Sequence, residues 1–136
     1  MRVVLDTNVL LSALLARGTP PDQLYEAWHD GKFDLISCER QIDEFRRATR
    51  QPFFHARIPR GEAGTMVNAI RERSRQFNRL PKVRRSADPD DDWLLALCEA
   101  SIADYLVTGD KSGLLALERH GTTRIVAPAE MIKVLG

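Results

Sequence analysis

The junction between the first apolar run and the first helical pattern constrains this chain more than any other stretch. Residues 2–5 form a short strand-like run that ends at the carboxylate of Asp6, and residues 8–16 continue at once with helical spacing. We therefore expect Asp6 at the carboxyl end of a first strand. In open parallel α/β sheets, ligands bind outside the carboxyl ends of the strands, where the strand order reverses. The junction is thus a candidate site.

Strand-like runs alternate with helical patterns over the rest of the chain. Further strands are expected at 33–37, 105–108 and 124–127, and helices at 21–30, 39–49, 62–77, 89–101 and 128–135, with a helical turn at 114–118. Because each strand is a short apolar run between helices, we predict an α/β fold: a three-layer α/β/α sandwich with a four- or five-stranded parallel sheet. A length of 136 residues suits a single domain, 1–136.

Other predictions concern the ends of helices and the segments between them. Ser37 is expected to cap helix 39–49 through its hydroxyl group. Residues 51–59 have no regular spacing and are expected to be irregular, and residues 79–85 form a basic connector.

The cysteines and the apolar runs indicate a soluble protein. Cys38 and Cys98 match no metal or redox spacing, and we expect buried, reduced thiols. The amino terminus has no basic region followed by an apolar core, and the longest uncharged run, 7–16, is about half as long as a membrane-spanning helix. We therefore expect a cytoplasmic protein without membrane association.

The net charge of +1 conceals a strong segregation of charge along the chain. Residues 46–85 carry twelve basic and two acidic side chains, a net charge of +10, whereas the other 96 residues carry eight basic and seventeen acidic ones, a net charge of −9. This excess of cations favours a polyanionic partner, above all nucleic acid. The side chains that we expect to contact phosphates are Arg46, Arg47, Arg50, Arg84 and Arg85.

Carboxylates from separate segments are expected at the carboxyl edge of the sheet. Asp6 and Asp110 each follow a predicted strand, and helices also begin at this edge because each crossover leaves from the carboxyl end of a strand. Glu44 lies one turn into helix 39–49, at the edge of its packed stripe, whereas Glu39 and Asp43 point more outward. We therefore choose Glu44 as the third carboxylate.

The acidic run 88–92 offers the fourth carboxylate. Asp88 suits the cap of helix 89–101, and Asp90 and Asp91 suit its first turn, where acids complement the exposed amides and the helix dipole. Asp92 lies beyond capping reach and borders an apolar run. Capping and the helix dipole account for Asp88, Asp90 and Asp91, so Asp92 is expected to belong to the site.

A cluster of these carboxylates would repel itself and raise its own pKa values unless a cation were bound. Mg²⁺ or Mn²⁺ fits better than zinc, because none of the three histidines belongs to a suitable ligand set. Such an ion can activate water for attack on a phosphodiester. Together with the basic segment, the carboxylates indicate hydrolysis of nucleic acid.

The chain resembles the PIN-domain nucleases, and within them the bacterial toxin-like PIN proteins related to the VapC toxins. The resemblance extends over essentially the whole chain and depends on motifs that occur in order: VLDTNVL at 4–10, Ser37 followed by Glu44, DPDDD at 88–92 followed by Ala96, ADYLVTGD at 103–110, and IVAPAEM at 125–131.

The resemblance implies a Mg²⁺- or Mn²⁺-dependent endoribonuclease with Asp6, Glu44, Asp92 and Asp110 as its acidic quartet. In this assignment the three aspartates hold the metal, and Glu44 orients or deprotonates the attacking water or holds a second ion. Asn8 and Thr108 match positions that support the metal site by hydrogen bonding. The resemblance also implies a homodimer, and a toxin whose site a protein antitoxin blocks.

Three alternatives compete with this interpretation. A non-catalytic RNA-binding module of the same fold is the strongest, although such a module has no need to keep all four acids. A haloacid-dehalogenase-like phosphatase requires a second aspartate two residues after the first, where this chain has Asn8. A response-regulator receiver requires an aspartate at the end of a middle strand, which 33–37 lacks.

Overall fold

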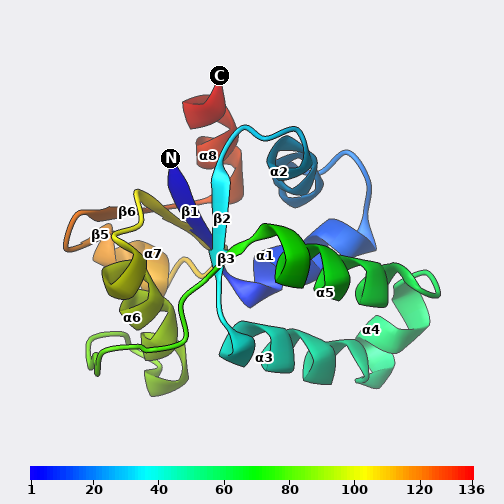
Figure 1. Cartoon of the computed structure of the whole chain (residues 1–136), viewed down its shortest axis with the longest axis horizontal. Coiled ribbons are helices and arrows are strands. Elements are labelled where there is room, and N and C mark those ends of the chain that lie inside the picture. Colours follow the sequence, from blue (N-terminus) through cyan, green and yellow to red (C-terminus); the bar gives the residue numbers. More distant parts are fainter.

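Six strands form one sheet in the computed structural model, which describes residues 1–136 (Figure 1). The strands are β1 (Arg2–Leu5), β2 (Asp34–Ser37), β3 (Arg75–Gln76), β4 (Tyr105–Val107), β5 (Arg119–His120) and β6 (Thr123–Val126). Their order in the sheet is β3-β2-β1-β4-β6-β5. The strands from β3 to β6 in this order are parallel, and the edge strand β5 is antiparallel to β6. The predicted α/β class is confirmed, with five parallel strands and one additional antiparallel edge strand.

Helices cover both faces of this sheet. They are α1 (Thr7–Leu15), α2 (Pro20–His29), α3 (Glu39–Thr49), α4 (Pro52–Arg57), α5 (Glu62–Arg73), the 3₁₀ turn η1 (Pro89–Asp91), α6 (Asp92–Ser101), α7 (Leu114–Leu117) and α8 (Pro128–Leu135). Apart from α4, α5, η1 and the start of α6, their ends lie within a residue or two of the predicted ones. None of the helices combines the length and the apolar character that a membrane span requires.

Three segments differ from the prediction. Residues 51–59 contain α4, which begins at Pro52, a residue suited to the first helical position because its missing N–H needs no partner there. The helix predicted at 62–77 ends at Arg73, because Ser74 is extended (φ −87°, ψ 163°) and the chain then pairs with β2 as β3. β5 was not predicted either, since two residues are too few to show a periodicity.

The predicted capping role of Ser37 is wrong. Ser37 is the last residue of β2, and its buried hydroxyl donates to Oε1 of Gln41 at 2.6 Å. Cys38 occupies the cap position without a capping side chain, and the Glu39 N–H donates instead to Oδ1 of Asn78 at 2.8 Å. Gln41 in turn donates to the carbonyl of Leu5 at 2.6 Å, so the start of α3 is tied to the end of β1.

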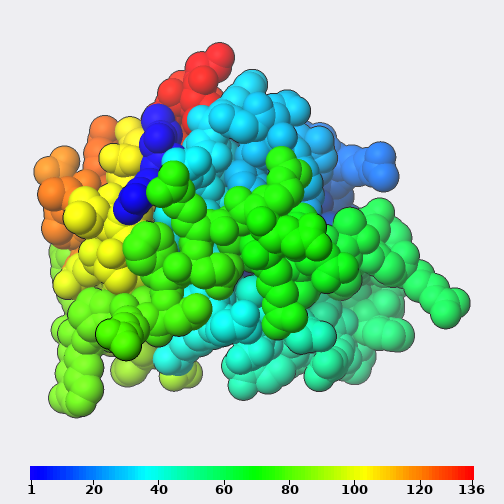
Figure 2. Space-filling view, in the orientation of Figure 1, coloured from blue at the N-terminus to red at the C-terminus, as the bar shows by residue number.

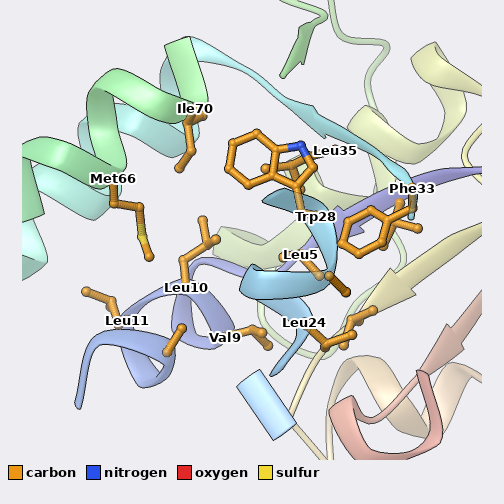
Figure 3. Packing of buried hydrophobic residues seen from close by; sticks show 14 of the residues in the cluster. Leu5, Val9, Leu10, Leu11, Leu24, Trp28, Phe33, Leu35, Met66 and Ile70 are labelled. Atoms are coloured by element: carbon orange, nitrogen blue, oxygen red, sulfur yellow. The ribbon is translucent and has the colours of Figure 1, made fainter. Parts of the chain in front are cut away.

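Side chains of the strands alternate between the two helical layers, and this alternation produces two cores. On one face, Leu5 and Leu35 belong to a buried cluster with Leu10 of α1, Trp28 of α2 and Met66 of α5 (Figure 3). Helices α3 and α8 also contribute to this cluster. The central strand β1 is therefore held from this side by several helices at once.

The opposite face of the sheet is covered by α6 and α7. Val4 and Ile36 pack there with the apolar residues of α6 and with Leu114 of α7. Figure 1 shows these two helices on one side of the sheet and α1, α2 and α5 on the other. Cys38 and Cys98 belong to this second cluster and are free and buried, as predicted.

The sheet topology determines where a site can form. From the central strand β1, the chain places β2 and β3 on one side and β4 and β6 on the other, so the order reverses between β1 and β4. Leu5 is in register with Val107, and the next residues of the two segments are Asp6 and Thr108. Their side chains therefore leave the sheet at the topological switch point.

The left-handed backbone conformation at the end of α6 can be tested by mutation. Ile102 has left-handed dihedral angles (φ 51°, ψ 52°), and its side chain is 70% exposed. This conformation costs a residue with a Cβ about 1–2 kcal/mol, whereas glycine adopts it freely and loses about 0.4–1 kcal/mol of unfolded-state entropy. We expect Ile102→Gly to raise the free energy of unfolding by about 0.5 kcal/mol, measured by urea denaturation. Ile102→Val keeps the branched Cβ and should leave the stability unchanged; a less stable glycine variant would contradict the assigned conformation.

Candidate functional site

Asp6 lies where β1 passes into α1, and hydrogen bonds fix its carboxylate. Its N–H donates to the carbonyl of Val107 at 2.9 Å, which continues the β1–β4 ladder by one residue. Oδ1 accepts the N–H of Asn8 at 3.3 Å and caps α1, and Oδ2 accepts the hydroxyl of Thr108 at 2.8 Å. Burial raises the pKa of this carboxyl group above its usual value, and the charge of Asp110 adds to the effect, although both hydrogen bonds oppose it.

The supporting residues predicted from the sequence contact Asp6 in different ways. Asn8 contributes only its backbone N–H, because its side chain is exposed and makes no hydrogen bond in the structure. Thr108 contributes its side chain: the buried hydroxyl donates to Asp6 and accepts the N–H of Asp110 at 3.1 Å. Thr108 therefore connects the carboxylate after β1 to the backbone of the carboxylate after β4.

Asp110 is held by the start of α7. Its Oδ1 accepts the N–H of Gly113 at 3.1 Å, and its Oδ2 accepts the N–H of Leu114 at 3.4 Å. A Cβ on Gly113 would overlap Oδ2 of Asp110, so only glycine allows the carboxylate to fold back over this turn. The sequence offered one signal for this role, a glycine at the start of a short helix, but its close approach to Asp110 is visible only in the structure.

Glu44 approaches these aspartates from α3. Burial raises the pKa of the half-buried Glu44 carboxyl group, and the charge of Asp6 raises it further, while Arg40 and Arg47 oppose the shift. The Thr7 hydroxyl lies near enough to favour the charged form of Glu44. This hydroxyl is buried and has no hydrogen-bond partner in the structure, so it is a free donor near Glu44.

Asp91 is the fourth carboxylate that faces this region. Partial burial raises its pKa to about 6, assisted by the negative charges of Asp6, Asp88, Asp110 and Glu44. Asp91 precedes α6 directly and its side chain makes no capping hydrogen bond there. In the structure, Asp91 rather than Asp92 is therefore the residue of the acidic run that lies near Asp6, Glu44 and Asp110.

The Asp92 carboxylate, predicted to join the other acids, contacts the connector after β3 in the structure. Its Oδ1 accepts the N–H of Arg85 at 3.1 Å, the N–H of Ser86 at 2.8 Å and the Ser86 hydroxyl at 2.8 Å. These hydrogen bonds lower the pKa of Asp92 and hold the connector against α6. The sequence predicts one α-helix over 89–101, whereas the 3₁₀ turn η1 changes the angular position of each residue before α6 begins.

The donor set of the site fits a hard divalent cation. All four side chains are carboxylates, and the charges of the others raise the pKa of Asp91, so a bound cation would relieve their repulsion. No three His, Cys, Asp or Glu side chains approach closely enough in this structure to enclose an ion. The set therefore suits an ion such as Mg²⁺, which keeps several of its water ligands, better than one that needs a complete protein cage.

The predicted phosphate-contacting arginines lie in two groups, one on α3 and one on the connector after β3. Arg46, Arg47 and Arg50 line a polar groove of about 580 Å³ along α3, together with Arg40 and Asp43. The exposed surface of the connector after β3, green to yellow-green in Figure 2, carries the second group. Within this group Arg84 is exposed, whereas the Arg85 guanidinium donates to the carbonyl of Arg119 at 2.7 Å.

Comparison with known proteins identifies a family for these residues. A family model described as a PIN domain matches residues 2–112, which include β1, α3, α6, β4 and all four carboxylates. No curated protein and no solved structure matches the chain. The matched description names no subfamily, so the resemblance to the VapC toxins stays a prediction.

The two neighbouring aspartates should respond to substitution with opposite signs. Because the pKa of Asp91 is raised on folding, its protonated form favours the folded state; this stabilisation is complete below the usual pKa of 3.8 and is lost as the pH rises through about 6. With chelator present, we expect Asp91→Asn to be more stable than the parent at pH 7.5 by about 1 kcal/mol, a value reduced for the exposure of the group. The difference should disappear below pH 4.

Asp92→Asn is the matched comparison. Its pKa is lowered on folding, so its charged form stabilises the protein above the usual pKa of 3.8, and this contribution is lost as the pH falls below it. The variant should therefore be less stable than the parent at pH 7.5, as measured by urea denaturation. The same sign for both variants would contradict the different environments assigned to the two aspartates.

Proposed function

Because the chain belongs to the PIN-domain family, whose members are generally nucleases, we propose that it is a metal-dependent endoribonuclease acting on RNA phosphodiester bonds. One observation carries the proposal: Asp6 and Asp110 are joined through Thr108 at the switch point of the sheet, and Glu44 and Asp91 lie near enough for the charge of Asp6 to raise their pKa values. Their hydrogen bonds within the fold do not explain the whole group, because burial and mutual repulsion of acids oppose folding.

Asp6, Asp91 and Asp110 are the residues that would hold a Mg²⁺ or Mn²⁺ ion, directly or through water, with Glu44 at the edge of the group. When bound, the ion would stabilise negative charge on the phosphoryl oxygens and favour the deprotonation of water. The backbone and side-chain hydrogen bonds of Asp6 and Asp110 keep both carboxylates in place before any ligand binds. Such preorganisation is what an electrostatic site requires.

Glu44 is suited to accept a proton from the attacking water. Its pKa is raised by burial and by Asp6, and a base is most effective when its pKa lies closer to the working pH. The unpartnered hydroxyl of Thr7 is positioned to steady the carboxylate of Glu44. Both residues belong to elements tied to β1, since Thr7 begins α1 and α3 is joined to Leu5 through Gln41.

The cations of α3 would position the RNA strand. Arg46, Arg47 and Arg50 lie on the same helix as Glu44, and phosphate contacts of this kind orient a strand without reading its sequence. We further propose that the enzyme acts in the cytoplasm as a homodimer and is the toxin of a toxin–antitoxin pair. The motifs shared with the VapC-related proteins support this part, and an antitoxin would act by covering the carboxylates.

The first test is cleavage of a labelled structured RNA by the purified chain, with Mg²⁺, with Mn²⁺ and with chelator. Asp91→Asn should reduce the rate at least about a hundredfold, because even the outer partners of a metal site commonly contribute 10–100-fold. Asp90→Asn, an exposed neighbour without a contact to the site, should leave the rate unchanged. Full activity in Asp91→Asn would remove this residue from the mechanism, and salt-sensitive binding without cleavage would favour the RNA-binding module.

The second test concerns the phosphate contacts of α3. With chelator present, the affinity for single-stranded RNA should fall with salt, and each lost phosphate contact should reduce the slope of log K against log salt by about 0.7. We expect Arg46→Ala combined with Arg50→Ala to reduce the slope by about 1.4. The control combines Arg57→Ala with Arg60→Ala, two cations that line a separate groove near α1 and α2. Equal slopes in the parent and the α3 variant would exclude this helix from the RNA interface.

A further inference from the structure

A second groove adjoins the carboxylates and has no role in the mechanism above. It has a volume of about 430 Å³ and lies between α3, the connector after β3 and the start of α6. Its apolar walls come from Leu80, Pro81, Val83 and Trp93. Leu80 and Val83 are partly buried against the same core cluster that contains Trp93, so these walls are anchored to the interior of the protein.

The rim of this groove is positively charged. Arg40, Lys82 and Arg84 line it, and the Arg40 guanidinium lies over the Trp93 ring, 5.8 Å from the ring centroid. The one acid among the lining residues is Asp92, and its Oδ1 already accepts three hydrogen bonds from Arg85 and Ser86. The groove therefore combines apolar walls with cations that have no matching acid inside it.

Both ends of the groove border the carboxylates. Arg40 lies one turn before Glu44 on α3 and opposes the rise in the pKa of Glu44. On the other side Asp92, which lines the groove, directly follows Asp91. The groove therefore begins within one helical turn of Glu44 and within one residue of Asp91.

We propose that this groove is a nucleotide subsite, which takes an unpaired base of the RNA strand next to the phosphate that lies among the carboxylates. The proposal rests on the proposed nuclease function for the identity of the strand. The volume is within the usual range for a small-molecule site, about 300–1,000 Å³. Apolar walls suit the flat faces of a base, and the rim cations suit its phosphate. A base in an A-form helix is stacked and paired, so the strand must be single where it enters.

The test compares two single-stranded RNA hexamers with equal numbers of phosphates, one of six uridines and one whose middle residues lack bases. Trp28→Phe leaves Trp93 as the sole tryptophan of the full chain, so its fluorescence reports directly on the groove. Chelator prevents cleavage during the titration. We expect the uridine hexamer to change the Trp93 fluorescence and to bind about tenfold more tightly than the abasic one.

Variants separate the base contact from the phosphate contact. Lys82→Ala should weaken both hexamers alike, whereas Leu80→Ala should reduce the difference between them. Arg79→Ala, on the same connector but outside the groove lining, is the matched control and should change neither affinity. If Trp28→Phe does not fold, uridine hexamers that carry 4-thiouridine should crosslink to residues 80–84 or 92–96 of the unmodified chain.

The outcomes distinguish the subsite from the nuclease. Equal affinities for the two hexamers, or crosslinks elsewhere, would overturn the subsite even if the protein cleaves RNA in Mg²⁺. A base-dependent Trp93 response in a protein that cleaves no RNA would keep the subsite and overturn the nuclease. A protein that neither binds nor cleaves would overturn both.

Discussion

The hydrogen bond between Thr108 and Asp6 is the interaction on which the rest of the site depends. It joins the ends of the two strands between which the sheet order reverses, and both partners are buried, so water does not compete for it. The same hydroxyl accepts the N–H of Asp110, and Asp6 also caps α1. One threonine thus fixes the carboxylate of Asp6 and the backbone of Asp110 relative to the central strands, and Gln41 attaches the start of α3 to the same strand end.

These carboxylates lower the stability of the folded protein near neutral pH. Burial raises the pKa of Asp6, Glu44 and Asp91, and for each of them a nearby carboxylate adds to the rise. A protein selected only for stability would replace such groups, because each charged carboxylate here disfavours the folded state near neutral pH. A ligand that binds only the folded state removes this penalty and stabilises the fold by mass action. This destabilisation by buried charge therefore indicates a site for a cationic ligand rather than poor packing.

Sequence reasoning located the parts of the site that depend on strand ends and missed those that depend on local helix geometry. Asp6 and Asp110 could be placed because parallel strands deliver their following residues to one edge. Asp91 could not be distinguished from Asp92, since a 3₁₀ turn of three residues leaves no periodicity in the sequence. The cap expected at Ser37 failed because β2 extends through Ser37, so Cys38 occupies the cap position of α3.

Basic and acidic residues that are separated along the sequence lie close together in the folded protein. Arg40 lines both the groove along α3 and the groove beside α6, and these grooves adjoin the carboxylates contributed by α3 and by the segment before α6. The cations do not neutralise the acids, because burial and Asp6 raise the pKa of Glu44 more than Arg40 and Arg47 lower it. Acids bordered by cations, rather than paired with them, suit a polyanion. Its flanking phosphates need the cations, and the phosphate among the carboxylates needs a metal ion, for which carboxylates are good ligands. The connector that Asp92 fastens to α6 therefore completes the arrangement, since it carries the second set of cations to the edge of the sheet.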